Sequence, residues 1–234
     1  MYEKTILCLA NSRKPPSGKC VAGRVFDGKN CGEWLRPVSA REKREVSEEE
    51  RRYPEGKLAQ LFHIISVPLV EPKPIDHQIE NHILDKDYYW QKVGVATWQQ
   101  VCAAIDKNDA AFWANCDSTI YGLNDKVHSA SAKRLGSSLK LIEVTDLDLI
   151  VAIEPGYQGA PGRKRVRGRF TYGRTTYTLS LTDPEIEDEQ LVKAPGTYHI
   201  GCALLCVSIV EVWNDYAFRV IASVLTEARC GAAK

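Results

Sequence analysis

The sequence has almost no net charge and no long apolar run. Its 31 Lys and Arg residues are balanced by 30 Asp and Glu residues, which leaves a formal net charge of +1. This balance argues against a protein that coats nucleic acid through its overall charge, so any attraction to phosphate must come from local clusters. No apolar stretch approaches ~18 residues without a charge, and no membrane span is therefore expected.

Several motifs of secretion and catalysis are also missing. No Gly-rich phosphate loop of the Walker or Rossmann type occurs, and no Gly-x-Ser-x-Gly nucleophile elbow. The first residues carry no basic segment followed by an apolar signal core. Of the eight cysteines, Cys8, Cys202 and Cys206 lie in apolar runs, where a free thiol packs as a small hydrophobe. We therefore expect a soluble protein of the reducing cytoplasm.

The residues that are present indicate a mostly β protein with minor α content. An apolar content of 44% and a charged content of 26% are typical of a globular protein. Period-two alternation and turn residues predict strands at 5–10, 20–26, 33–38, 58–70, 138–153, 164–172, 175–182, 202–211 and 217–225. The Pro- and Gly-containing segment 11–19 is predicted to be a loop.

Helices are expected at three places. The dense charge of 41–53 predicts a solvated helix, and 97–105 has helical spacing of its apolar residues. A further helix is predicted to begin after Asp183, with Pro184 at its first position. We expect the tryptophans of the middle segment to pack between the two halves of the chain; they are Trp90, Trp98 and Trp113.

The order of these elements predicts two OB-like, five-stranded Greek-key barrels in tandem. The second half reads strand, strand, strand, short helix, strand, strand. The first half repeats this order from 5 to 70, with its fifth strand unassigned. We place the first barrel and a connecting helical segment at 1–115 and the second barrel at 116–234, packed together through the partly helical middle segment.

Short blocks spread along nearly the whole chain resemble a known family. They are 8–14, 34–39, 77–81, 124–127, 138–142, 169–172, 181–184 and 205–208. In these blocks the sequence is similar to the bacterial dual OB-containing domain proteins. The resemblance implies two OB barrels and nucleic-acid recognition, in a setting of bacterial conflict or defence. It implies no catalytic residues.

The strongest local cluster of charge is a run of alternating arginines. On an extended strand Arg163, Arg165, Arg167 and Arg169 fall on one face, at roughly 6–7 Å per step. The following strand is expected to add Thr176, Thr178 and Ser180 to the same face. Clustered arginines favour contact with phosphate. The alternative is a solvated face whose arginines pair with the acids of 183–189.

The first half offers a second candidate surface. We expect the loop at 11–19 and the adjoining strand face to contact ligand as in other OB barrels. The candidate side chains can donate hydrogen bonds, stack on bases or bind phosphate. They are Asn11, Ser12, Arg13, Lys14, Trp34, Arg36 and Arg41.

We therefore predict a module that binds single-stranded or flexible RNA or DNA, without a cofactor and without a membrane. The spacing of His77, Glu80 and His82 fits no standard zinc pattern, so no metal site is assigned. Two alternatives stay open. One is an enzyme acting on nucleotides or nucleic acid through residues such as Glu80 and Asp125, with no catalytic residue assigned. The other is a module that binds a protein partner or a small nucleotide.

Overall fold

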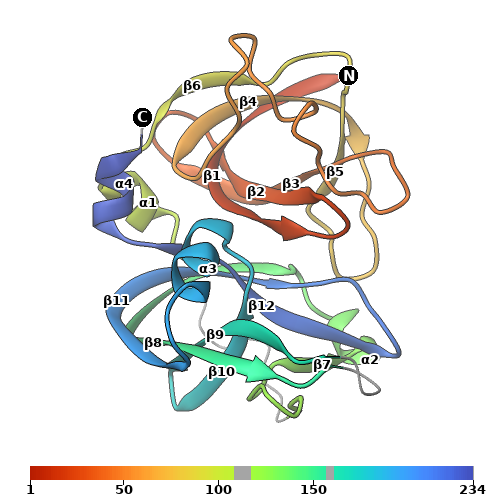
Figure 1. The fold of residues 1–234 in the computed structure, drawn as a ribbon. Coiled ribbons are helices and arrows are strands. Elements are labelled where there is room, and N and C mark those ends of the chain that lie inside the picture. The colour runs from red at the N-terminus through yellow and green to blue at the C-terminus, as the bar shows by residue number, and fades with distance from the viewer. Residues whose placement is uncertain (108–116, 157–160, 234) are drawn as a thin grey trace. The chain divides into compact units, whose positions relative to one another are not determined.

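The protein is described by a computed structural model that covers residues 1–107, 117–156 and 161–233 (Figure 1). The chain divides into two compact units. The first comprises Met1–Ile105, Gly136–Leu139 and Leu225–Lys234, and the second comprises Asp106–Leu135 and Lys140–Val224. Two segments that follow residue 115 thus belong to the first unit. No helix in the described ranges is long and apolar enough to cross a membrane.

The first unit contains a closed five-stranded barrel. Its strands pair in the order β1-β2-β3-β5-β4, and β4 pairs again with β1. A further strand, β6, pairs with β4, and two short helices complete the unit. The elements are β1 (Tyr2–Lys14), β2 (Gly18–Phe26), β3 (Cys31–Val38), β4 (His63–Pro72), β5 (Asn81–Leu84), β6 (Gln91–Val95), α1 (Trp98–Ala103) and α4 (Glu227–Ala232).

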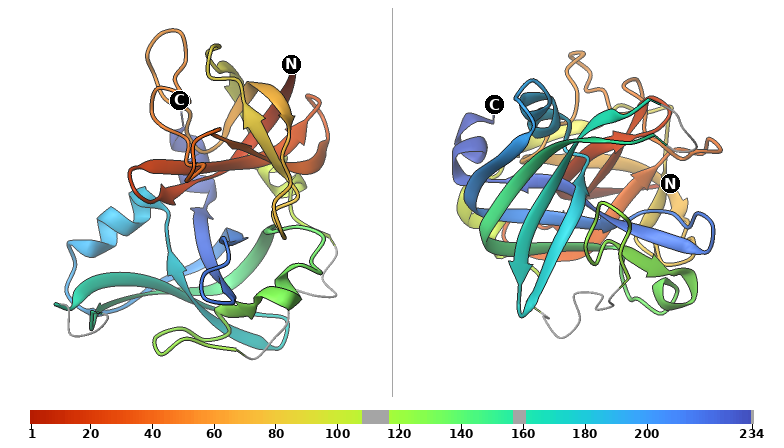
Figure 2. Two further views of the ribbon diagram at one scale, coloured as in Figure 1. Left: turned by 90° about the vertical axis from the view of Figure 1, so that its right-hand side faces the viewer. Right: turned by 60° about the horizontal axis from the view of Figure 1, so that its bottom comes forward.

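The second unit repeats this arrangement. Its strands pair in the order β8-β9-β10-β12-β11, with β8 next to β11 and an additional strand, β7, on β12. The right-hand view of Figure 2 shows its curved sheet. The elements are β7 (Lys126–His128), α2 (Ser129–Ala132), β8 (Leu139–Glu154), β9 (Arg163–Tyr172), β10 (Thr175–Leu181), α3 (Pro184–Leu191), β11 (Gly196–Ile209) and β12 (Tyr216–Leu225).

The two barrels have the same topology. In each, the third and fifth strands of the barrel pair in parallel, β3 with β5 and β10 with β12. A five-stranded Greek-key barrel closed in this way is the OB fold. The prediction of tandem OB barrels is therefore confirmed.

Each barrel encloses its own apolar core. The first is built around Ile6, Leu35 and Trp90, so Trp90 packs inside one barrel. The second is built around Leu149, Phe170 and Ile221. Trp98 lies half-buried on α1, and Trp113 lies outside the described residues. No disulfide joins the cysteines that the structure describes; Cys8 and Cys206 are buried as expected, whereas Cys202 is exposed.

Two local predictions in the first barrel were wrong. The predicted loop at 11–19 is mostly strand, because β1 continues to Lys14 and pairs with Gly18 of β2, which leaves only 15–17 as a turn. The predicted helix at 41–53 does not form. There, the Glu50 carboxylate accepts hydrogen bonds from Ser39, Arg41 and the backbone N–H of Ser47. These bonds hold an irregular connection in place of helix.

The second half follows its predictions more closely. Residues 138–153 were expected to form strand, and residues 139–153 lie in the single long strand β8. The helix α3 begins at Pro184 after Asp183, as predicted. The Asp183 carboxylate, however, does not cap the helix; it accepts a hydrogen bond from the backbone N–H of Val224, 3.0 Å away. Asp183 therefore ties the helix start to β12.

Candidate nucleic-acid interface

The alternating arginines lie on the outward face of β9. Arg163, Arg165 and Arg169 are exposed and Arg167 is half-buried, whereas Val166, Gly168 and Phe170 between them point into the core. Period-two alternation thus places the four guanidinium groups on one face, as the sequence predicts. We call these four residues the arginine strip.

Neighbouring strands extend this face on both sides of the strip. Across β10, Thr178 stands opposite Arg169 and Ser180 stands opposite Arg167. Directly opposed residues share a face of the sheet, so the expected hydroxyl side chains do lie beside the arginines. Across β8, Glu154 stands opposite Arg163 and Asp148 opposite Arg169.

Two members of the strip are paired with carboxylates. Arg167 makes a bidentate ion pair with Glu154, with Nε 2.6 Å from Oε1 and Nη2 3.1 Å from Oε2. Its Nη1 is 3.5 Å from Oδ2 of Asp125. Arg169 pairs with Asp148 at 2.9 Å. The acidic partners therefore come from β8 and from the segment before β7, which corrects the alternative of pairing with 183–189.

The other two members differ in this respect. Among the described residues, neither Arg163 nor Arg165 has an ion-pair partner within 4.0 Å. The Glu154 carboxylate that stands nearest to Arg163 in the register is held by Arg167. The strip thus has one end whose charge is neutralised and one end whose charge is available to an anion.

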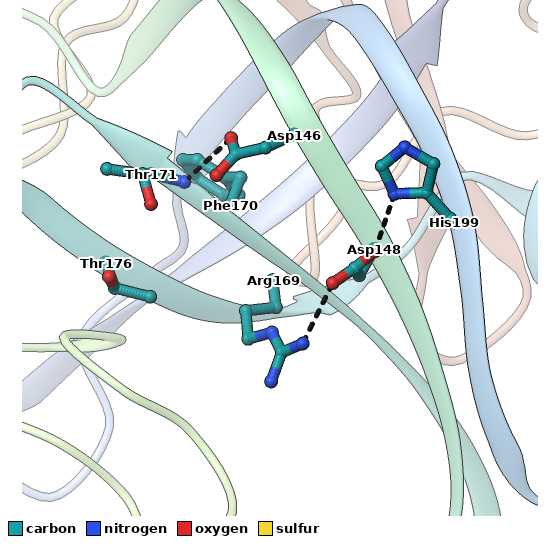
Figure 3. A pocket seen from close by; sticks show the side chains of 7 residues that line it. All are labelled: Asp146, Asp148, Arg169, Phe170, Thr171, Thr176 and His199. Carbon is teal, nitrogen blue, oxygen red and sulfur yellow. Dashed lines mark hydrogen bonds and ion pairs between the residues drawn. The ribbon is translucent and has the colours of Figure 1, made fainter.

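A polar hollow of about 360 Å³ opens beside the neutralised end (Figure 3). Its lining includes Asp146, Asp148, Arg169, Thr176 and His199. Asp148 stands between Arg169 and His199, whose Nδ1 is 2.9 Å from its Oδ1. The hydrogen bond from Arg169, and to a smaller extent the one with His199, hold the pKa of Asp148 below its usual range. This carboxylate is therefore ionised at neutral pH.

The loop between β11 and β12 presents an exposed tryptophan that the sequence reasoning missed. Trp213 is 61% exposed, and so large an exposed fraction is unusual for tryptophan. The loop is a tight turn in which Trp213 and Tyr216 exchange backbone hydrogen bonds, with positive φ at Asn214 and Asp215. In the sequence, the Asn214-Asp215 pair indicates a turn. A tryptophan directly before a turn could have been recognised as a candidate for exposure at the surface.

The predicted residues of the first barrel fall into two groups. The first group, Asn11, Ser12, Arg13 and Lys14, lies at the end of β1 beside the β1–β2 turn. Asn11 is tied to the backbone carbonyl of Ala59, and Ser12 is buried. Arg13 is exposed and Lys14 is partly exposed.

The second group is enclosed or committed to protein partners. Trp34 is only 6% exposed, and the guanidinium of Arg24 lies 4.9 Å from its ring centroid. Arg36 is 2% exposed and forms a 3.1 Å ion pair with Glu80. Arg41 is ion-paired with Glu50 at 2.8 Å. The expected pairing of a stacking Trp34 with a phosphate-binding Arg36 therefore does not occur at the surface.

Buried polar groups surround Arg36. Its Nη2 donates to the Ser138 hydroxyl at 2.9 Å, and that hydroxyl in turn donates to Glu80. Asn81 and Gln78 join this group, because Arg36 donates to the Asn81 side chain and Asn81 donates to Gln78. His77, from the same segment considered for metal binding, is also buried. This buried group of polar side chains is a structural network rather than a ligand surface.

Comparison with known proteins adds one match. A family model described as a dual OB-containing domain matches residues 4–224. No curated protein and no solved structure matches the chain. The family match spans both barrels, whose strand order is that of the OB fold. The chain belongs to the family of dual OB-containing domain proteins.

Proposed function

We propose that this protein recognises single-stranded or flexible nucleic acid through the outward face of β9 and β10 in the second barrel. These are the second and third strands of that barrel, and the same strands form the usual oligonucleotide-binding face of OB folds. The observation that carries the proposal is the pair Arg163 and Arg165, two exposed arginines on this face with no acidic partner among the described residues.

The state of each arginine suggests a different role. Arg163 and Arg165 gain most from a phosphate, because no protein carboxylate has to be displaced and counterions are released on binding. Arg167 is fixed by Glu154, so its remaining N–H groups are oriented for hydrogen bonds but its charge is compensated. A near-neutral protein can thus present a local anion-binding site.

Trp213 supports a preference for unpaired bases. The loop that carries it joins the fourth and fifth strands of the barrel, and in OB folds this loop flanks the ligand. An exposed indole held by a tight turn can stack on a base that is free of its partner strand. Arg13 and Lys14, beside the β1–β2 turn, are proposed as contacts that the first barrel makes by itself.

The proposal is tested by fluorescence anisotropy with labelled single-stranded RNA and DNA over a series of salt concentrations. We expect the logarithm of the binding constant to fall linearly with the logarithm of salt. The double variant Arg163→Gln/Arg165→Gln should bind more weakly, and its slope should be shallower by roughly 0.7 for each lost contact. Trp213→Ala should weaken binding by about tenfold, as expected for loss of one stacked base.

A matched control removes the same charge elsewhere. Arg52 and Lys57 are exposed residues of the first barrel, outside every proposed contact. The variant Arg52→Gln/Lys57→Gln should keep the slope of the unmodified protein. If both double variants change the slope equally, or if no oligonucleotide binds at low salt, the proposed surface is wrong.

A further inference from the structure

The hollow beside Arg169 has a different chemical character from the rest of the arginine strip. Two carboxylates line it together with one guanidinium and one imidazole. Asp148 lies between Arg169 and His199, and Asp146 points toward the backbone N–H of Thr171 (Figure 3). A phosphate placed here would meet more negative than positive charge whenever His199 is neutral. The hollow therefore favours an uncharged ligand group.

The lining also argues against a stacked base. Phe170 is the one aromatic carbocycle among the lining residues, and it is 1% exposed. Its ring is stacked on Tyr177 inside the core, with 5.4 Å between the ring centroids. The exposed ring among the lining residues is then the imidazole of His199, and its Nδ1 is held by the Asp148 carboxylate. The lining therefore favours a hydrogen-bonded ligand group over a stacked base.

Hydrogen-bonding groups are abundant instead. Asp146 is oriented through Oδ1, which accepts the backbone N–H of Thr171 at 3.1 Å. Its Oδ2 has no hydrogen-bond partner among the described residues, so it can accept from a ligand. The Thr176 hydroxyl and the guanidinium of Arg169 border the same hollow. An uncharged group that both donates and accepts hydrogen bonds suits these neighbours, and a sugar hydroxyl has this property.

We propose that this hollow is a ribose subsite, in which the Asp146 carboxylate accepts a hydrogen bond from the ligand's 2′-hydroxyl and so selects RNA over DNA. The 2′-hydroxyl is the group by which a protein distinguishes the two nucleic acids at one site. This inference rests on the proposed function, because it assigns the sugar of the same bound strand.

The spacing along β9 is compatible with one continuous ligand. Arg165, at the available end of the strip, and Arg169, at the hollow, are four residues apart on one strand. At about 3.3 Å per residue this separation is roughly 13 Å. A flexible strand can therefore place a phosphate at Arg165 and a ribose of a nearby nucleotide in the hollow.

The test compares oligomers that differ at the 2′ position only. The probes are labelled oligouridine RNA, the deoxyuridine DNA of the same length and the 2′-O-methyl RNA, all measured at one salt concentration. We expect the unmodified protein to bind RNA about tenfold more tightly than either analogue, as for loss of one hydrogen bond to a charged group. Asp146→Ala should abolish this ratio while DNA affinity stays the same or rises.

The control is Glu143→Ala, which removes an exposed carboxylate from the same strand outside the hollow. It should preserve the ratio of RNA to DNA affinity. A general loss of folding in Asp146→Ala would lower DNA binding as well, and DNA affinity therefore serves as the internal check. Equal affinity of the unmodified protein for RNA and DNA, or a ratio unchanged by Asp146→Ala, overturns the subsite and leaves nucleic-acid binding standing. Absence of binding to all three probes overturns both proposals.

Discussion

Some arginine side chains in this protein are buried and others are exposed, and the sequence alone does not distinguish the two kinds. Arg36 and Arg165 both lie within strands, yet Arg36 is 2% exposed and Arg165 is exposed. Both faces of β3 are covered at Arg36, and one of the covering groups is Ser138, which is 102 residues away in the sequence. Period-two alternation gives the face of a side chain but not whether a distant segment covers that face.

The buried Arg36–Glu80 pair leads to a prediction for stability. Glu80→Gln should destabilise the first barrel by about 3 kcal/mol, because it leaves a buried guanidinium without its counter-charge. Urea unfolding followed by tryptophan fluorescence measures the change. The exposed pair of Lys4 and Glu33, with side chains 38% and 68% exposed, provides the comparison. Glu33→Gln should change stability by less than about 1 kcal/mol; similar losses in both variants would contradict the assigned role of Glu80.

The candidate site was only partly predictable, because alternation shows which side chains share a face but not which distant segments lie beside that face. The arginine strip and its hydroxyl neighbours follow from alternation within one hairpin, since β9 and β10 are joined by a short turn at Gly173. The acids that neutralise Arg167 and Arg169 come from β8 and from Asp125. The sequence reveals neither the register of β8 with β9 nor the contact of Asp125 with Arg167. The hollow depends on that register, so it could not be predicted.

At the scale of elements, close packing of β1 against β2 makes one glycine indispensable. A Cβ added at Gly23 would lie 2.1 Å from the backbone oxygen of Leu7, at the irregularity in β1 between Cys8 and Ala10. The obstacle is backbone rather than a mobile side-chain end. The two strands would have to separate to admit any other residue.

Gly23→Ala should therefore destabilise the protein by about 3 kcal/mol or more, as expected for overpacking against a fixed backbone. Gly32→Ala is the matched control, because a Cβ at Gly32 would have its nearest neighbour 3.6 Å away. The control should remain within about 1 kcal/mol of the unmodified protein. Thermal and urea unfolding of both variants test this contrast, and equal stability of the two would show that β1 can move at Gly23.

Element boundaries were predicted best where local chemistry decides them. Pro184 at the first helical position correctly marks the start of α3. The segment 41–53 has charge typical of a solvated helix, but carboxylate bonds from Glu50 stabilise a different conformation. The short strand β5 was unassigned because its four residues form strand through parallel pairing with β3, a contact between distant segments.

At the scale of the molecule, the repeated topology was predictable but the composition of the first unit was not. The order of elements along the sequence contains the OB pattern twice, once for each barrel. It does not show that Gly136–Leu139 and the C-terminal segment return to the first unit. Two observations explain why they do: Ser138 joins the Arg36–Glu80 pair, and Cys230 of α4 is hydrogen-bonded to the backbone carbonyl of Ala96.

This composition predicts unequal behaviour of the two halves when they are expressed separately. A fragment of residues 1–115 lacks both returning segments, so the Arg36–Glu80 pair loses Ser138 and α1 loses its contact with α4. A fragment of 106–225 retains every strand of the second barrel. We expect well-dispersed amide resonances and cooperative unfolding from 106–225, and poorly dispersed resonances from 1–115. Extending the first fragment at its end with 225–234 should restore part of its stability, because α4 can again pack on α1. The fragment 1–115 could instead unfold cooperatively and be as stable as the first barrel of the whole chain. That result would show that the two returning segments do not stabilise the barrel.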